Sequence, residues 1–253
     1  YFESLETIFD FNFFNIQKFD LSCIQSHAEL TNSKEQVMVS AADRVFKQYA
    51  GFLRGNLFSF NLASIFFDLG GLGFGIPFNG TVSAKPFHNI PCKPALILEA
   101  AKRLPHGTNL VWLDADCVLK KSPRPLAANY DFCFTIRKEK SKKIQEGWIN
   151  AGVISMTISR ETLLFLRLWQ SLTELKGGDQ YALNLLLFDD FIKPKRPNFV
   201  SDLIIAGVPV EVFNNFLLGK SEHSVIDHYK ANIRGYHPIF RAKRYGKTIE
   251  KST

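Results

Sequence analysis

Two aspartates separated by one residue, Asp114 and Asp116, directly follow an apolar run at residues 110–113. The run has the length and composition of a buried strand, so both carboxylates stand at a strand end. On an extended chain this spacing directs both side chains to the same side, where they can share one cation. Because two desolvated carboxylates repel each other, the pair predicts a bound divalent metal; the alternative is an acidic turn.

A second apolar run, residues 37–43, ends in the small residues Ala41 and Ala42 and the acid Asp43. We expect a short buried strand there, followed by a helix at 44–53. Small side chains at its end leave room for a flat group such as a nucleobase. The alternative is a plain turn in which Asp43 caps the following helix.

Strands and helices alternate around these two runs. A strand with a glycine turn is expected within residues 59–75, whose glycines lack the spacing of a phosphate-binding loop. A helix is expected at 92–101, because proline suits a first helical turn. This alternation favours an α/β sheet with ligands at the strand ends.

Further elements are expected on both sides of this region. The expected segments are strands at 130–136 and 148–156, a helix at 161–175, a second helix from 179 to 188, one or two strands at 202–212, and a helix or edge strand within 1–36. The chain shows no repeat and no low-complexity linker, so we expect one domain over residues 1–253.

Composition limits the classes of protein that remain. The chain has 253 residues, 46% of them hydrophobic, and a net charge of +7. These values are ordinary for a globular protein, and no apolar run is long enough to span a bilayer. The basic residues cluster at 137–143, 193–196 and 234–251 without a zinc finger or RNA-binding motif, so we expect no nucleic-acid partner. The four scattered cysteines favour a reducing, cytoplasmic location. The basic tail at 241–253 suggests peripheral contact with a membrane surface.

Several motifs agree in order and spacing with those of the GT-A glycosyltransferases, and the layout resembles the glycogenin and plant xylosyltransferase families most closely. The resemblance covers residues 37–238. The matching pieces are the strand at 37–43, Lys93-Pro94, Asp114-Ala115-Asp116, Asn150-Ala151-Gly152-Val153, Asp179-Gln180 and His228.

The resemblance implies a Rossmann-like α/β fold, a mixed sheet flanked by helices. It divides the chain into a nucleotide-binding half at about 37–116, a donor-sugar and acceptor half at about 117–240, and the basic tail. The implied activity is metal-dependent sugar transfer in glycan or surface polysaccharide synthesis. A UDP-sugar would be the donor, and a hydroxyl of a glycan or of a lipid-linked glycan the acceptor.

The resemblance also implies a ligand set for the metal. Asp114 and Asp116 would bind Mn²⁺ or Mg²⁺ together with His228, and Asp114 would also contact the ribose. His237 competes for the third position, and His223 is a more distant alternative. The residues after His228 depart from the glycogenin-like pattern of His, then Gly, then Lys-Pro-Trp.

The remaining implied contacts are to the donor. Ala41 and Asp43 would contact the nucleotide, and Lys93 the nucleotide or diphosphate; the alternative for Lys93 is a solvated residue at a helix start. Lys230 could hold a phosphate oxygen as a point charge.

Two motifs would meet the sugar. The small turn Asn150-Ala151-Gly152 would lie near the donor sugar, unless it is only a tight strand entry. Asp179 and Gln180 would reach the donor sugar or the acceptor hydroxyl, and Asp179 can alternatively cap its helix. In an inverting enzyme Asp179 would act as general base, whereas in a retaining enzyme Asp179 or Gln180 would stabilise an oxocarbenium-like transition state.

Two other interpretations use the same residues. In a haloacid-dehalogenase-type phosphatase, Asp114 would be the nucleophile and Asp116 the general acid, with Thr135 and Asp189-Asp190 supplying later motifs. That arrangement normally opens its domain, whereas here an α/β half precedes it. In a non-enzymatic basic module binding nucleic acid or membrane, the two aspartates would have no role.

Overall fold

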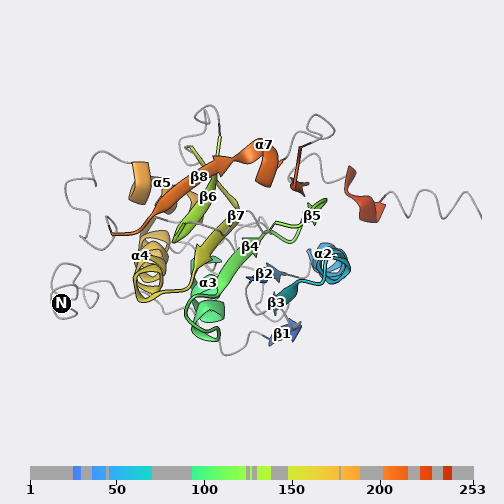
Figure 1. Cartoon of the computed structure of the whole chain (residues 1–253), viewed down its shortest axis with the longest axis horizontal. Helices are drawn as coiled ribbons and strands as arrows, with labels where there is room; N and C mark the ends of the chain where they lie inside the picture. Colours follow the sequence, from blue (N-terminus) through green and yellow to red (C-terminus); the bar gives the residue numbers. More distant parts are fainter. Residues whose placement is uncertain are drawn as a thin grey trace, which may run out of the picture.

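A mixed seven-stranded sheet forms the centre of the protein, in the order β1-β3-β2-β4-β7-β6-β8 (Figure 1). The structure is a computed structural model that describes residues 25–29, 36–43, 46–69, 93–123, 126, 130–137, 148–176, 178–188, 202–215, 223–229 and 236–240. The strands of this sheet are β1 (Gln25–Glu29), β2 (Gln36–Ala42), β3 (Ala63–Asp68), β4 (Asn109–Leu113), β6 (Phe132–Ile136), β7 (Ile149–Thr157) and β8 (Ile205–Pro209).

The directions of the strands explain why two aspartates lie at the same edge of the sheet. β3, β2 and β4 are parallel neighbours, with Val39 opposite Trp112. β7 runs antiparallel to both β4 and β6, while β1 runs antiparallel at the edge beside β3. Because parallel strands end at the same edge of a sheet, the chain leaves β2 and β4 on the same side, where Asp43 and Asp114 follow.

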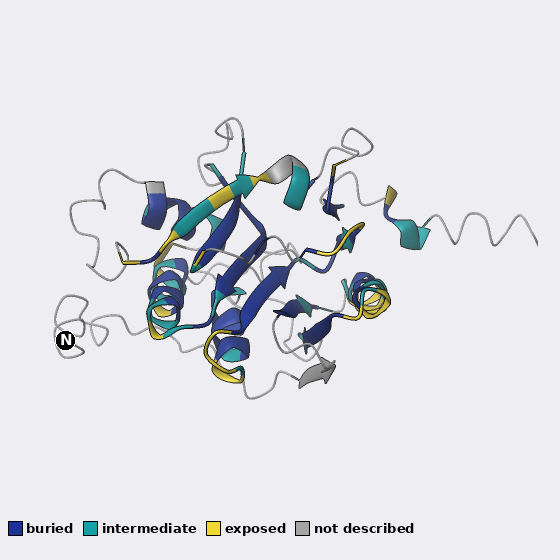
Figure 2. Ribbon diagram, viewed as in Figure 1, coloured by how far each residue is buried: buried dark blue, intermediate teal, exposed yellow. Residues whose placement is uncertain are grey.

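Both faces of the sheet are buried, which accounts for the continuous apolar runs in its strands. Val37 and Val39 face a core shared with the helices α3 (Lys93–Lys102), α4 (Arg160–Lys176) and α5 (Asp179–Phe188). Met38, between them, faces the opposite core with α2 (Lys47–Ser59). Figure 2 shows β4 and β7 in dark blue between these layers, whereas β8 at the edge is only partly buried.

A short ribbon outside the main sheet brings together distant parts of the sequence. β5 (Cys117–Leu119) follows the two aspartates and pairs antiparallel with β9 (Ile226–His228). The register places Cys117 opposite His228, so β9 returns the chain to the aspartates. A one-turn helix, α7 (Val210–Phe213), leads from β8 towards this ribbon.

Most expected elements are confirmed, and the differences have physical reasons. The helix expected at 44–53 is α2, which begins at Lys47 because Asp43 first forms a turn with Phe46. The segment at 202–212 contains one strand followed by helix α7, not a second strand. The segment within 1–36 contributes edge strand β1.

Some expectations fall on parts of the chain outside the description. The glycines at 70–75, the basic runs at 138–143 and 193–196, and the tail at 241–253 all lie outside the described residues. Among the described residues, Cys117 and Cys133 are buried free thiols. No helix of the described residues combines the length and the apolar character that crossing a bilayer requires.

Candidate functional site

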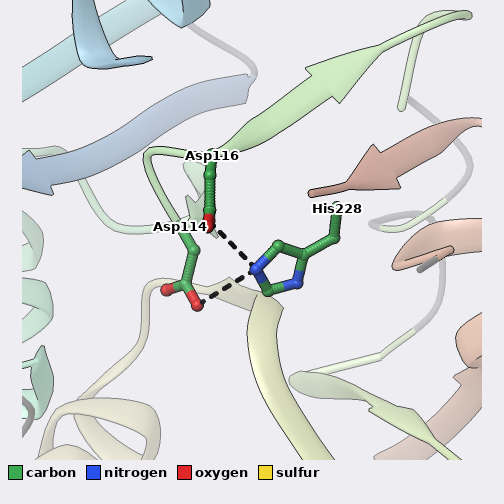
Figure 3. Close-up of side chains that lie close together, drawn as sticks. All are labelled: Asp114, Asp116 and His228. Carbon is green, nitrogen blue, oxygen red and sulfur yellow. Dashed lines mark ion pairs between the residues drawn. The ribbon is translucent and has the colours of Figure 1, made fainter. Parts of the chain in front are cut away.

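Asp114, Asp116 and His228 come together at the C-terminal edge of the parallel strands (Figure 3). Each offers one ligand atom, and these atoms lie within 4.8 Å of one another. His228 Nε2 is 3.0 Å from Asp116 Oδ1 and 3.7 Å from Asp114 Oδ2. Asp116 and His228 are buried, so water screens their interaction little.

Backbone hydrogen bonds fix these residues from both sides. The amide of Asp114 donates to the carbonyl of Gly152 on β7, and the amide of Cys117 donates to the carbonyl of Asp114. The amide of Tyr229 donates to the carbonyl of Asp116, which fastens the end of β9 to the turn between the aspartates. The turn is therefore held by elements far apart in the sequence.

Gly152 makes room for the imidazole. A Cβ at this position would come within 2.5 Å of His228 Cε1 and 2.6 Å of His228 Nδ1. Only glycine allows the ring to lie against the β7 backbone at this distance.

Lys93 links the two acidic parts of the site. From the first residue of α3, its Nζ lies 2.9 Å from Asp114 Oδ1 and 3.1 Å from Asp179 Oδ2. It also donates to the carbonyl of Ala151 at 2.9 Å, and it lies 5.7 Å from the ring centroid of Trp112. The structure thus surrounds Lys93 with acceptors and leaves only 13% of its side chain exposed, unlike a solvated residue at a helix start.

The two oxygens of Asp114 have different partners. Oδ1 accepts from Lys93 Nζ and, at 3.0 Å, from Trp112 Nε1, while Oδ2 faces His228. This arrangement orients the carboxylate with one oxygen directed to the lysine and the other to the imidazole.

Burial and neighbouring charges both shift the pKa values of the ionisable residues in this site. Burial by itself lowers the pKa of Lys93, but the charges of Asp114 and Asp179 together raise it above its usual value, so the ammonium is retained. Burial raises the pKa of Asp179, and the lysine opposes that shift. The same desolvation, together with the nearby aspartates, raises the pKa of the Cys117 thiol, which stays protonated and unreactive.

Asp179 and Gln180 begin α5 and face the entry of β7. The side chain of Gln180 accepts a hydrogen bond from the amide of Ala151 at 3.2 Å, and Trp169 Nε1 donates to the carbonyl of Asp179 at 2.7 Å. The carboxylate of Asp179 pairs with Lys93, and the backbone amide of Gln180 adds to the effects that lower its pKa.

The expected nucleotide strand ends close to the aspartates. Ser40 Oγ donates to the carbonyl of Leu113 at 2.8 Å, which ties the end of β2 to the end of β4. Ala41 is partly exposed at this edge. Asp43 accepts from the amide of Phe46 at 3.0 Å, as expected for a residue that prepares the start of α2.

The competing histidines lie elsewhere. His237 is packed among the rings of Tyr49, Phe52 and Tyr229 and takes no part in the ligand group that the described residues form. His223 is exposed and also stands outside that group, while Lys230 falls outside the described residues.

The sequence interpretation missed Asn214. Its side chain is fully buried, and its Oδ1 lies 2.7 Å from His228 Nδ1. The available signal was a pair of amides, Asn214 and Asn215, set between Phe213 and Phe216. Two amides in an apolar segment need specific partners once they are buried.

Comparisons with known proteins bear on the family and the fold of this chain. Residues 94–234 match the family model of nucleotide-diphospho-sugar transferases. No curated protein matches the chain. A glycosyltransferase involved in glycosylation of the major capsid of PBCV-1 has a similar fold, with a TM-score of 0.53 and 13% identity, over 80% of this chain and 98% of that chain. The galactosyltransferase LgtC, solved with donor and acceptor sugar analogues, gives a TM-score of 0.48 and 13% identity over 86% of this chain and 96% of that chain.

The family match spans more than half of the chain and includes all three members of the ligand group. It accounts for the α/β architecture and favours sugar transfer over both the phosphatase and the non-enzymatic interpretation. The chain belongs to the nucleotide-diphospho-sugar transferase family and is a glycosyltransferase.

Proposed function

We propose that this glycosyltransferase is metal-dependent, and that Asp114, Asp116 and His228 bind the cation. The observation that carries the proposal is the convergence of three ligand atoms within 4.8 Å at the C-terminal edge of the sheet. A UDP-sugar is the proposed donor, and a hydroxyl of a glycan or of a lipid-linked glycan is the proposed acceptor.

The residues present fit a hard divalent cation. Two carboxylates and one imidazole suit Mn²⁺ or Mg²⁺, and the ring is held on its far side by Asn214, as metal-binding histidines usually are. When bound, such a cation would neutralise the charge that develops on the diphosphate leaving group.

The chain's own residues would orient the donor. Lys93 holds Asp114 and Asp179 in fixed positions, and we propose that its ammonium adds positive charge beside the diphosphate. We propose that Asp179 and Gln180 contact the sugar, supported by the hydrogen bond that ties Gln180 to Ala151.

The other proposed donor contacts lie on either side of the aspartates. Asn150, Ala151 and Gly152 would border the sugar, and Ala41 and Asp43 the nucleotide. Lys230 remains a predicted phosphate contact. On this proposal residues 37–116 and 117–240 are two halves of one domain that meet at the aspartates, and membrane contact through the tail stays a prediction.

Thermal shift with a panel of nucleotide sugars, with and without Mn²⁺, tests the proposal. We expect one UDP-sugar to raise the melting temperature only when Mn²⁺ is present. Asp116→Asn should abolish this shift, because the amide keeps the shape of the side chain and removes its charge.

Asp131→Asn is the matched control. Asp131 Oδ2 accepts from the amide of Ile204 at 2.9 Å, and an asparagine oxygen can accept the same bond. Its backbone bonds Thr157, which pairs with the first residue of β4, so Asp131 lies at the opposite end of the strands from the ligand group. A metal-dependent shift that survives in Asp116→Asn, or no shift with any nucleotide sugar, would contradict the proposal. Product analysis should show nucleoside diphosphate and no phosphate release from phosphomonoesters.

A further inference from the structure

We infer that Asn214 is a positioning residue that fixes both the tautomer and the orientation of His228. The inference rests on the proposed metal site and names a residue that takes no direct part in it. The Asn214 side chain contacts His228 Nδ1 on the side of the ring opposite Nε2.

The backbone N–H of Gly152 can only donate, so it identifies the atom that it contacts. The amide of Gly152 donates to Asn150 Oδ1 at 3.1 Å, which identifies that atom as the oxygen of the Asn150 side chain. An oxygen there must accept from Asn214 at 3.0 Å, so the Asn214 atom facing it is the NH₂ group.

A second chain of bonds gives the same assignment. The hydroxyl of Thr135 donates its single hydrogen to the carbonyl of Asn150 at 2.6 Å, since a carbonyl can only accept. Thr135 Oγ1 is then an acceptor for Asn214 Nδ2 at 2.8 Å. Two independent partners therefore place the NH₂ group of Asn214 on the β6–β7 side.

The oxygen of Asn214 must then face His228. Because this oxygen can only accept, His228 Nδ1 carries a hydrogen and donates it over 2.7 Å. In the neutral ring, a hydrogen on Nδ1 leaves the lone pair on Nε2, the atom that faces Asp114 and Asp116. The hydrogen-bond network thus selects the tautomer in which Nε2 can bind a metal.

Burial prevents water from replacing this network. Asn214 and Thr135 are 0% exposed, Asn150 is 2% exposed and His228 is 3% exposed. If Asn214 lost its amide, the ring could populate both tautomers and rotate about its side-chain bonds. Partners of this kind typically contribute 10–100-fold to metal affinity.

Mn²⁺ binding by Asn214→Leu, followed by the electron paramagnetic resonance signal of free Mn²⁺, tests the inference without any transfer assay. We expect a Kd roughly 10–100-fold weaker than that of the unmodified chain. Asn215→Leu is the matched control, because Asn215 is also buried and adjacent, and its side chain donates to Asp227 Oδ1.

The outcomes separate this inference from the proposed function. If the unmodified chain binds no Mn²⁺, the proposed metal site fails. If it binds Mn²⁺ and Asp116→Asn does not, but Asn214→Leu binds as tightly as the unmodified chain or Asn215→Leu is weakened equally, only the role of Asn214 fails.

The protonation of His228 can also be measured spectroscopically on the unmodified chain, so this test does not require that any variant folds. Long-range ¹H–¹⁵N correlation spectra distinguish a protonated from an unprotonated ring nitrogen. We expect His228 Nδ1 to give the signal of a protonated nitrogen. An unprotonated Nδ1 would overturn the inference whatever the variants do.

Discussion

The imidazole of His228 lies against the backbone of Gly152, so close that a Cβ on residue 152 would approach His228 Nδ1 to 2.6 Å. This relationship joins β7, which contains Asn150, Ala151 and Gly152, to β9, which supplies the proposed third ligand. The ring has space because residue 152 is a glycine without a side chain. Substitutions at this and three other positions test how the site and the fold are held together.

Gly152→Ala should displace the imidazole, because the new methyl group and the ring cannot occupy the same space. We expect Mn²⁺ affinity and transfer activity to fall at least about tenfold, and stability to fall by about 1–3 kcal/mol from overpacking. Isothermal titration with Mn²⁺ and urea denaturation measure the two effects.

Gly51→Ala is the control for Gly152→Ala. Gly51 lies within α2, and nothing lies within 4 Å of a Cβ built there. This substitution should leave Mn²⁺ affinity unchanged and raise stability by about 0.5–1 kcal/mol. Equal metal affinity in Gly152→Ala and the unmodified chain would show that the ring adapts.

Lys93→Met should be strongly destabilising. Removal of the ammonium leaves Asp114 and Asp179 close together in a poorly hydrated site, and breaking one partner of a buried ion pair costs about 3–5 kcal/mol. We expect a loss of stability of this order in urea denaturation, partly restored when Asp179→Asn is added. Transfer activity should be lost even at temperatures where the variant is folded.

Lys47→Met serves as the comparison for Lys93→Met. Lys47 pairs with Asp68 at 3.8 Å, but its side chain is 77% exposed. An exposed pair of this kind contributes about 0–1 kcal/mol. Similar losses in both variants would argue against a special role for the buried lysine.

The strands could be predicted from the sequence because both faces of the sheet are covered. β2, β4 and β7 are apolar along almost their whole length, and such runs are recognisable without knowledge of their neighbours. β5 and β9 could not be predicted, since three-residue strands have no periodicity and form only because they pair with each other.

The aspartates could be predicted as a site for the same local reason, since their spacing is visible in the chain. The contact of His228 with Asp116 depends on the register of β5 with β9 and was reached only through family resemblance. Asn214 was missed because its role depends on four side chains from β6, β7 and β9 and the segment after α7, a tertiary relationship with no short-range signature.

Asp43→Ala and Asp43→Asn separate a structural role in the turn before α2 from nucleotide binding. The carboxylate accepts from the amide of Phe46 in this turn, and loss of such a hydrogen bond costs about 1 kcal/mol. An asparagine oxygen can accept the same bond, so Asp43→Asn should keep its stability while Asp43→Ala loses about 1 kcal/mol in urea denaturation. If the negative charge also contacts the nucleotide, both variants should bind the UDP-sugar more weakly in titration calorimetry. Full affinity in Asp43→Asn would restrict Asp43 to its role in the turn.

The stability of the protein should fall in mild acid because of His237. Its ring is 0% exposed and packs edge-on against Tyr49, and burial lowers its pKa from 6.5 to about 4 although Asp116 opposes the shift. Above 6.5 the ring is neutral in both states. Below it, the unfolded chain binds a proton that the folded chain does not accept until the pH nears 4, so unfolding becomes more favourable as the pH falls through this window.

His237→Phe isolates this effect, because phenylalanine fills the aromatic site between Tyr49 and Phe52 without titrating. Urea denaturation at about pH 7.5 and about pH 5 should show that the unmodified chain loses about 2 kcal/mol more stability than the variant. Carboxylates titrate in both proteins, so their contribution cancels in the comparison. Parallel losses in the two proteins would mean that His237 already carries its proton inside the fold, or that its site opens to water before the chain unfolds.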